Sequence, residues 1–386
     1  MEDHITSIIK LVHDSPTQLV LAVAGAGTTA LSDLLAVGGA SRTLLEAIVP
    51  YSNAAFTSFL NGEMPKQYVS EQTARLMAGC AFNRAQQLIP RAEHEDAQIV
   101  GVACTAAIAS DRPKKGEHRA HIACWSQDRV VSQSMTLDKG KRTRVEEELL
   151  VSRLMMQMLA EVSGIDAEMP VALLDGDLLL QETYDFRAIA ECLFNREVAY
   201  FGLNDHGRIR TPDNAHPITL LPGSFNPLHE GHLGMAQVAT RLLNRPIAFE
   251  LSAFNVDKPP IPVDEVLRRI SQFAGQYPIY VSNAPTYLGK SQLFPGATFV
   301  VGYDTAARVV APRYYQESEE AMLAALETIQ ARDCHFLVAG RMDKEGIFRT
   351  LDDMTVPDGF ESLFSAIPSG MFRNDISSTQ LRGVTK

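Results

Sequence analysis

The sequence predicts two α/β domains, and three observations support this. The chain has 386 residues, more than the roughly 100–200 residues typical of one domain. Hydrophobic residues make up 46% of the chain, enough to fill two cores. In both halves, apolar runs of strand length alternate with longer stretches of helical periodicity, a pattern typical of α/β folds. We therefore expect a first domain at 1–164, a connector at 165–217 and a second domain at 218–386.

The first domain is expected to begin with an amphipathic helix, because Ile5, Ile8, Ile9 and Val12 fall on one helical face. A strand-like run then leads into the glycine-rich turn at 25–29 and a second helical pattern. Strands are expected at 18–24, 99–104, 119–125 and 130–137, and helices at 70–88 and 144–162. This alternation predicts one packed α/β domain.

The connector is expected to hold a short helix at 186–194 and to end in a segment rich in turn formers at 211–217. His206 and His216 lie in its turns. We expect both to be solvated loop residues rather than ligands of a metal or a substrate.

The second domain is expected to be a doubly wound parallel sheet. Apolar runs predict strands at 218–221, 247–251, 279–281, 298–301, 335–339 and 363–367, with helical patterns between most of them, the clearest at 318–331. Ligands of such sheets bind beyond the carboxyl ends of the strands. Several polar and glycine-containing segments follow the predicted strands directly, so we expect the functional site there.

The run GSFNPLHEGHL at 223–233 follows the first of these strands and leads into a helical pattern. A strand, a glycine turn and a helix in this order place free backbone N–H groups and the positive end of the helix dipole at one crevice, which suits a phosphate. His229 and His232 lie one turn apart at the start of this helix, so both can reach one anion.

The run DISSTQLR at 375–382 supplies a second motif near the end of the chain. Together with HEGH at 229–232, in the same order, it resembles the two signatures of the HxGH nucleotidyltransferases, in particular the nicotinamide mononucleotide adenylyltransferase family. The resemblance implies a Rossmann-like domain that transfers AMP from ATP to a phosphate monoester. The acceptor it favours is nicotinamide mononucleotide, with NAD and pyrophosphate as products.

The resemblance also implies roles for residues of the first motif. His232 would donate a hydrogen bond to the α-phosphate in the transition state, and His229 would bind the phosphate chain beside it. Gly223, Ser224 and Phe225 form the turn at which the backbone approaches the nucleotides. The attacking phosphate is already ionised at pH 7, so this chemistry needs positioning and charge stabilisation rather than a general base.

The second motif would bind the leaving phosphates. Ser377 can cap a short helix whose first turn holds Ser378 and Thr379, and these hydroxyl and N–H groups can bind the β- and γ-phosphates. Arg382, on the next turn, would add a guanidinium group that can bind a phosphate through two N–H groups.

Other charged residues match the family in the loops that follow strands. Lys258 resembles a lysine that neutralises phosphate, with a solvated loop lysine as the alternative. Asp304, after Gly302, resembles an acid that accepts from a ribose hydroxyl, although capping of the next helix is also compatible. Arg341 would reach the adenine or the leaving phosphates, or form a surface ion pair. Mg²⁺ is expected to arrive with ATP, because no carboxylate cage is visible.

Other acceptors and donors remain open. HxGH enzymes also use phosphopantetheine, choline phosphate or glycerol phosphate, and CTP in place of ATP. A different class of function, a regulatory or scaffolding protein that binds nucleotides without turnover, is the alternative to an enzyme.

The first domain carries weaker motifs, GGAS at 38–41, YSN at 51–53 and VS at 69–70. These resemble the C-terminal domain of the CinA family of nicotinamide mononucleotide deamidases, over residues 1–164. The sequence departs from that family where its chemistry resides, because Ala26 stands at the nucleophilic serine and Phe56 at the expected lysine.

Neither a methyl group nor a phenyl ring can act as a nucleophile or lower the pKa of one. We therefore expect that the first domain does not deamidate, unless Thr28, Thr29 or Ser52 takes over. Two options remain for this half: a retained nucleotide pocket, or a scaffold that forms a homo-oligomer and stabilises the other half.

The composition excludes some partners. The 46 acidic and 35 basic residues give a formal net charge of −11, which argues against non-specific binding of nucleic acid or of an anionic membrane. No run of 18 uninterrupted apolar residues occurs, so we expect no membrane span and a cytoplasmic protein, with a nuclear location also compatible. The five cysteines form no CxxC pair and are expected to be buried free thiols.

Overall fold

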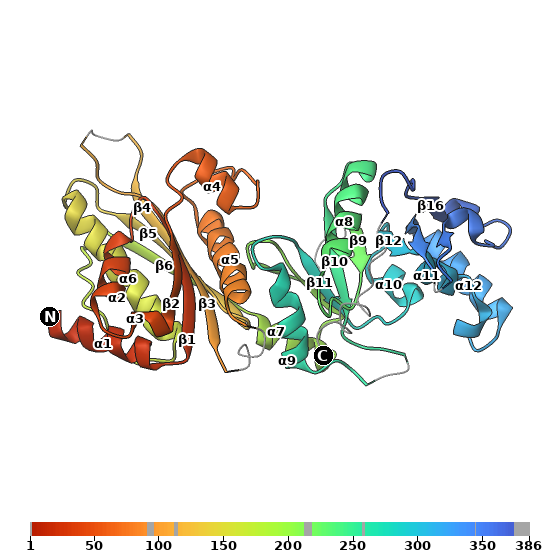
Figure 1. The fold of residues 1–386 in the computed structure, drawn as a ribbon, viewed down its shortest axis with the longest axis horizontal. Helices are drawn as coiled ribbons and strands as arrows, with labels where there is room; N and C mark the ends of the chain where they lie inside the picture. The colour runs from red at the N-terminus through yellow and green to blue at the C-terminus, as the bar shows by residue number, and fades with distance from the viewer. Residues whose placement is uncertain are drawn as a thin grey trace. The chain divides into compact units, whose positions relative to one another are not determined.

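The computed structural model describes residues 2–90, 96–111, 115–211, 218–256, 259–343 and 345–373 (Figure 1). The described residues form two compact units. The first unit lies within 1–188, 204–209 and 271–277, and the second within 189–203, 210–270 and 278–386.

The first unit is built on a six-stranded sheet with the strand order β2-β1-β3-β4-β5-β6. β1 pairs in parallel with β2 and β3, and the pairs from β3 to β6 are antiparallel. The strands are β1 (Thr17–Ala24), β2 (Leu44–Ile48), β3 (Gln98–Ala107), β4 (His118–Trp125), β5 (Arg129–Leu137) and β6 (Leu178–Asp185).

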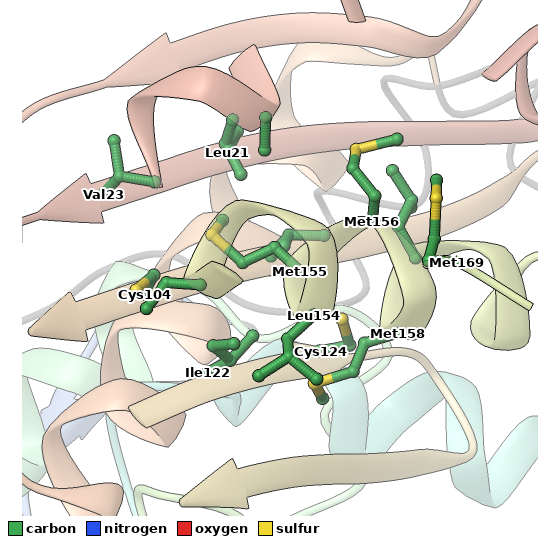
Figure 2. Packing of buried hydrophobic residues seen from close by; sticks show 14 of the residues in the cluster. Leu21, Val23, Cys104, Ile122, Cys124, Leu154, Met155, Met156, Met158 and Met169 are labelled. Atoms are coloured by element: carbon green, nitrogen blue, oxygen red, sulfur yellow. The ribbon is translucent and has the colours of Figure 1, made fainter. Parts of the chain in front are cut away.

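Helices cover both faces of this sheet. They are α1 (Glu2–Asp14), α2 (Thr28–Ala36), α3 (Ala40–Thr43), α4 (Asn53–Phe59), α5 (Glu71–Leu88) and α6 (Arg144–Val162). Side chains of α1, α2 and α6 share one hydrophobic core with one face of the strands. That core is rich in sulfur, since Met155, Met156 and Met158 of α6 pack near Cys104 and Cys124 (Figure 2). α5 packs on the other face, so the expected α/β domain is confirmed.

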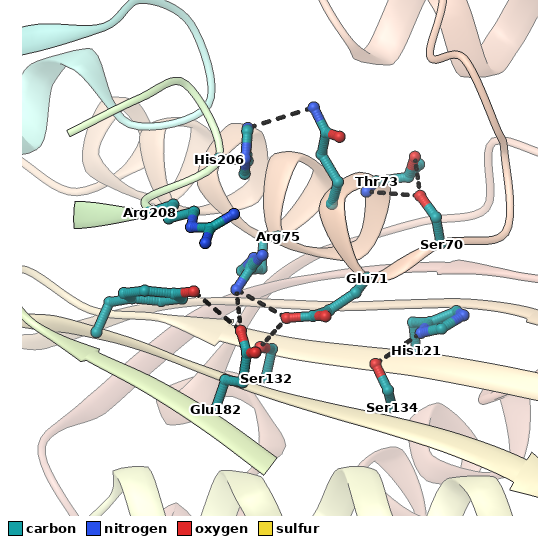
Figure 3. Close-up of polar contacts among 12 residues, drawn as sticks. Ser70, Glu71, Thr73, Arg75, His121, Ser132, Ser134, Glu182, His206 and Arg208 are labelled. Carbon is teal, nitrogen blue, oxygen red and sulfur yellow. Dashed lines mark hydrogen bonds and ion pairs between the residues drawn. The ribbon is translucent and has the colours of Figure 1, made fainter. Parts of the chain in front are cut away.

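Polar contacts attach α5 to the antiparallel half of the sheet (Figure 3). The Arg75 guanidinium lies 2.8 Å from Glu71 and 3.1 Å from Glu182, and it stacks 5.0 Å above the Tyr184 ring. Burial raises the pKa of Glu71, whereas the Tyr184 hydroxyl lowers the pKa of Glu182 by donating a hydrogen bond to it. Arg75 therefore joins α5 to β6 across β5, with its charge balanced by Glu182.

The second unit contains an eight-stranded sheet with the order β16-β13-β12-β9-β10-β11-β7-β8. The strands are β7 (Tyr200–Leu203), β8 (Ile209–Arg210), β9 (Thr219–Pro222), β10 (Ile247–Ser252), β11 (Ile279–Ser282), β12 (Thr298–Gly302), β13 (His335–Ala339) and β16 (Phe364–Ala366). β9 to β13 and β16 pair in parallel, and β7 is antiparallel to β11.

The chain order around β9 creates a switch point. From β9 the chain adds β10 and β11 on one side, then crosses to β12 and β13 on the other. The loops after β9 and β12 therefore leave in opposite directions, which opens a crevice between them. The doubly wound sheet predicted from the sequence is confirmed.

Connecting helices and a small hairpin complete this unit. The helices are α8 (Glu230–Leu243), α9 (Val263–Ile270), α10 (Tyr287–Leu293), α11 (Tyr303–Val309) and α12 (Glu319–Ala331), and the hairpin pairs β14 (Arg341–Met342) with β15 (Phe348–Arg349). Phe299, Phe336 and Leu326 lie at the centre of the core between the sheet, α10 and α12.

The segment expected as a connector contributes strands to both units. β6 pairs with β5 of the first sheet and β7 with β11 of the second, while α7 (Phe186–Phe194) forms the expected short helix. His206 was expected to be solvated, and this is wrong: its side chain is 13% exposed and lies 2.8 Å from the Asp205 carboxylate. His216 lies outside the described residues.

All five cysteines are free, and four of them are buried, as expected. Among the helices that the structure describes, none combines the length and the apolar character that crossing a bilayer requires.

The close packing of α5 on β3 gives a stability test. A Cβ atom at Gly101 would lie 2.1 Å from the Ala78 carbonyl oxygen and 2.3 Å from the Phe82 nitrogen, and backbone atoms cannot move aside cheaply. We expect Gly101→Ala to lower the free energy of unfolding by about 1–3 kcal/mol or more. Gly38→Ala is the matched control, because a Cβ at Gly38 meets nothing within 4 Å. Equal urea midpoints for the two variants would contradict this account.

Candidate functional site

A cavity of about 150 Å³ lies at the switch point of the second sheet, beyond the carboxyl ends of β9, β12 and β13. Its lining combines the start of α8 with the loops that follow these strands. The lining residues are Leu221, Pro222, His229, Gly231, His232, Met235, Tyr287, Val300, Val301, Gly302, Thr305, Ala339, Gly340, Arg341 and Phe372. Four of the residues singled out from the sequence, His229, His232, Gly302 and Arg341, are thus brought together.

The turn after β9 is shaped by a buried phenyl ring. Gly223 continues the sheet by donating its N–H to the Glu250 carbonyl oxygen at 2.9 Å. A Cβ atom at Gly223 would lie 2.6 Å from the Phe225 ring, so the glycine makes room for this ring. Phe225 is fully buried and packs edge-on against Phe249 and His232, with ring centroids 5.4 and 5.1 Å apart. Only the backbone of Phe225 is therefore placed to meet a ligand.

The two histidines are held by the backbone at the start of α8. His229 is the N-cap residue, and its Nδ1 accepts a hydrogen bond from the Gly231 N–H at 3.1 Å. The His232 Nδ1 accepts from the His229 N–H at 3.4 Å, and the two ring centroids lie 3.9 Å apart. Because a neutral imidazole carries one proton, acceptance at Nδ1 places that proton on Nε2. Each ring thus carries its proton on Nε2, as an N–H donor.

Electrostatics keeps both imidazoles neutral. Burial lowers the pKa of His232 to about 3, and the neighbouring His229 and Arg341 act in the same direction because a second positive charge beside them is unfavourable. Burial and Arg341 also lower the pKa of His229. At pH 7 the pair therefore offers two neutral N–H donors, and Arg341 supplies the positive charge of this part of the cavity.

Arg341 and Asp304 form an ion pair at the cavity. The Arg341 Nη1 lies 3.2 Å from the Asp304 Oδ2, and the two side chains are 44% and 45% exposed. This matches the surface ion pair that the sequence left open for Arg341. An exposed pair of this kind contributes at most about 1 kcal/mol, so a bound nucleotide can compete for either partner.

Part of the predicted site lies beyond the residues that the structure describes: Lys258, Ser377, Ser378, Thr379 and Arg382. Phe372, however, lines the cavity together with both histidines. Ser224 is exposed, and its carbonyl oxygen accepts from Arg269 at 3.1 Å.

A buried polar cluster next to the cavity was not expected from the sequence. Lys290 of α10 lies 2.5 Å from the Glu250 carboxylate, and these side chains are 4% and 0% exposed. The Ser282 hydroxyl donates to Glu250 at 2.6 Å, and Ser252 also hydrogen-bonds Lys290. The cluster fixes α10, and α10 carries Tyr287 in the cavity wall. Only the tertiary fold shows that Glu250 and Lys290 face each other.

In the first unit, a side chain of the same protein binds the hydrogen-bond donors of the glycine turn. The Glu148 carboxylate accepts from the Gly27 and Thr29 N–H groups and from the Thr28 hydroxyl, each at 3.0 Å. It therefore satisfies the donors at the start of α2 that suit an external anion.

The two departures from the deamidase pattern are also buried. Ala26 is 2% exposed and Phe56 is 3% exposed. The Phe56 ring packs edge-on against Tyr68, with centroids 5.1 Å apart. Neither position presents a reactive group to solvent.

A doubly wound sheet with a cavity at its switch point is the kind of fold in which nucleotides bind, and one family model matches this part of the chain. Residues 220–384 match the cytidylyltransferase-like family, so the C-terminal part of the chain carries a cytidylyltransferase-like domain. This match supports the assignment of the domain to the nucleotidyltransferases as a reaction class. No curated protein matches the chain.

Solved structures of CinA-superfamily proteins match the N-terminal region. The competence/damage inducible protein CihA of Agrobacterium tumefaciens shares 23% identity, over 41% of this chain and 95% of that one, with a TM-score of 0.34. A CinA-superfamily protein of Klebsiella pneumoniae shares 14% identity over 42% and 98%, with a TM-score of 0.34. A CinA-superfamily protein of Escherichia coli shares 21% identity, over 42% of this chain and 88% of that one, with a TM-score of 0.30. The matches fall on the same two parts of the chain as the two resemblances stated from the sequence.

The Glu250–Lys290 pair gives a second stability test. Lys290→Met leaves the Glu250 charge buried without its cation, so we expect a loss of about 3–5 kcal/mol in the free energy of unfolding. The double variant Glu250→Gln, Lys290→Met removes both charges and should recover part of that loss. Chemical denaturation measures both effects. A double variant less stable than the single one would show that the pair is not the source of the loss.

Proposed function

We propose that the second unit is a nucleotidyltransferase that transfers AMP from ATP to nicotinamide mononucleotide, giving NAD and pyrophosphate. The supporting observation is that two imidazole N–H donors, one guanidinium and the start of α8 meet at a single cavity at the switch point. The family match supports the reaction class. The choice of ATP and of the nicotinamide acceptor rests on the resemblance of the HEGH and DISSTQLR motifs.

The geometry suits catalysis by charge stabilisation. An oxygen of the acceptor phosphate forms a bond to the α-phosphorus, and the bond from that phosphorus to the bridging oxygen breaks, so pyrophosphate leaves with the electron pair. No proton has to move. Nε2–H of His232 donates to an α-phosphate oxygen, where negative charge accumulates, and His229 donates to the phosphate chain. Arg341 offsets the repulsion between the two anionic substrates.

Mg²⁺ is proposed to enter as the counter-ion of the triphosphate, where it would neutralise phosphate charge. Among the described residues no three His, Cys, Asp or Glu side chains gather in a way that could hold a metal. In the described part of the chain, the proposed donors to the phosphates are the imidazoles, the guanidinium and backbone N–H groups.

For the first unit we propose a scaffolding or nucleotide-binding role without deamidation. Three observations support this: an alanine stands at the position of the nucleophile, a buried phenylalanine stands at the position of the lysine, and Glu148 occupies the donors of the glycine turn.

The enzyme assignment predicts a selective loss in His232→Ala. Removing a donor to the developing charge should reduce kcat by about 10²–10³-fold. His335→Ala is the matched control, because His335 is a 47% exposed histidine at the amino end of β13, away from the cavity. Pyrophosphate release from ATP or CTP with several phosphate monoesters measures the rates. A wild type that binds nucleotides but never turns over would favour a binding protein.

The lowered pKa values predict the pH profile. The pKa of His232 is lowered to about 3 and that of His229 is lowered from its usual 6.5, so kcat/KM should not fall as pH rises from about 6 to 8. If the imidazolium forms were required, kcat/KM would decline through that range. Initial rates at low substrate concentration in buffers of constant ionic strength distinguish the two outcomes.

The first unit is expected to release no ammonia. Full-length protein incubated with nicotinamide mononucleotide, without any nucleoside triphosphate, should match the blank in a coupled ammonia assay. Steady turnover would show that another hydroxyl has replaced the missing nucleophile.

A further inference from the structure

We infer that Phe372 forms the nucleobase wall of the cavity, against which the base of the nucleoside triphosphate stacks. The inference rests on the proposed function, because it assigns a subsite to the donor nucleotide. Three features carry it: the place of Phe372 in the cavity, the contacts of residues 372 and 373 with α8 and with the β14–β15 hairpin, and the presence of both polar and apolar groups in the cavity lining.

Phe372 lies directly on α8. It lines the cavity together with His229 and His232, and a Cβ atom at Gly234 would lie 3.2 Å from the Phe372 Cε2. Gly234, two residues after His232, thus lets the ring approach the helix. The Phe372 N–H points back to the Pro368 carbonyl oxygen at 3.4 Å, and that of Met371 does so at 2.9 Å, so a turn places the ring.

The next residue attaches this segment to the opposite side of the cavity. The Arg373 guanidinium lies 5.1 Å from the centre of the Phe348 ring. That ring packs so closely on Gly340 that a Cβ there would lie 2.6 Å from it. Gly340 lines the cavity beside Arg341. Residues 372 and 373 therefore contact both α8 and the β14–β15 hairpin, which holds the Phe372 ring in place.

The cavity lining includes groups that suit both chemical halves of a nucleotide. His229, His232 and Arg341 provide the donors and the positive charge that suit phosphates, whereas Met235 and Phe372 are apolar. Tyr287, the other aromatic residue of the lining, is less suited to stacking. Its ring already packs edge-on against two rings of the core, with centroids 5.4 Å and 5.2 Å apart.

Stacking does not depend on the identity of the base. Every nucleobase has an aromatic face, and stacking on a side-chain ring strengthens binding by a factor of roughly 10 to 100. A Phe372 wall therefore serves ATP and CTP alike, and the inference holds for either donor.

Phe372→Trp tests the contact directly, because the sequence contains a single tryptophan, the buried Trp125 of the first unit. The full-length variant is titrated with ATP, with CTP and with inorganic tripolyphosphate while indole fluorescence is recorded. We expect quenching by at least one nucleotide and none by tripolyphosphate at saturating concentration. Equal quenching by tripolyphosphate, or nucleotide binding detected by calorimetry without any quenching, would overturn the inference.

Kinetics provides the second measurement. Phe372→Leu should raise KM for the triphosphate roughly 10- to 100-fold with little change in kcat, and Phe372→Tyr should restore the wild-type KM. Met371→Ala is the matched control, since Met371 is the preceding apolar residue and is 47% exposed. If a folded Phe372→Leu protein has an unchanged KM, the Phe372 subsite is ruled out, but the enzyme assignment is unaffected. If nucleotides quench Phe372→Trp but the protein never releases pyrophosphate, the subsite is supported and the enzyme assignment is ruled out.

Discussion

Two hydrogen bonds from backbone N–H groups to imidazole nitrogens, at the first turn of α8, determine what the second unit can do. They use up the Nδ1 atoms of His229 and His232 and leave the Nε2–H groups as donors. Burial, which for His232 includes packing on Phe225, and the nearby Arg341 charge lower the pKa of both rings, so both are neutral at pH 7. The site therefore offers fixed donors of constant charge, which suits a reaction in which negative charge shifts between oxygens and no proton is transferred.

The two units use the same local pattern with opposite results. In each, a parallel strand ends in a glycine turn that leads into a helix. In the second unit the helix start opens onto a cavity lined by neutral and cationic donors. In the first unit the Glu148 carboxylate from α6 already satisfies the helix start. A glycine turn before a helix is thus a potential anion site, and a single acidic side chain elsewhere in the chain decides whether it is available.

The sequence could predict what depends on local pattern. The long helices α5, α6 and α12 begin and end within a residue or two of the expected positions, because their apolar periodicity and their capping residues are local signals. The meeting of the HEGH segment with Gly302 and Arg341 followed from the rule that ligands bind beyond the carboxyl ends of parallel strands. β6 was not foreseen, because most of its residues are exposed and its sequence lacks strict alternation. The Glu250–Lys290 pair and the cavity position of Phe372 arise from contacts between distant segments, which no local pattern encodes.

The sulfur-rich core of the first unit has a consequence of its own. Met155, Met156 and Met158 are unbranched and polarisable, so they can adjust to irregular gaps and to altered neighbours at little cost. Burial raises the pKa of Cys124 to about 12 and raises that of Cys104, so both thiols stay protonated and inert toward electrophiles while the unit is folded. The same atoms become targets once the fold opens, since oxidised thioethers are polar and cannot return to an apolar interior. Oxidative damage to this unit would thus follow unfolding and then make it permanent.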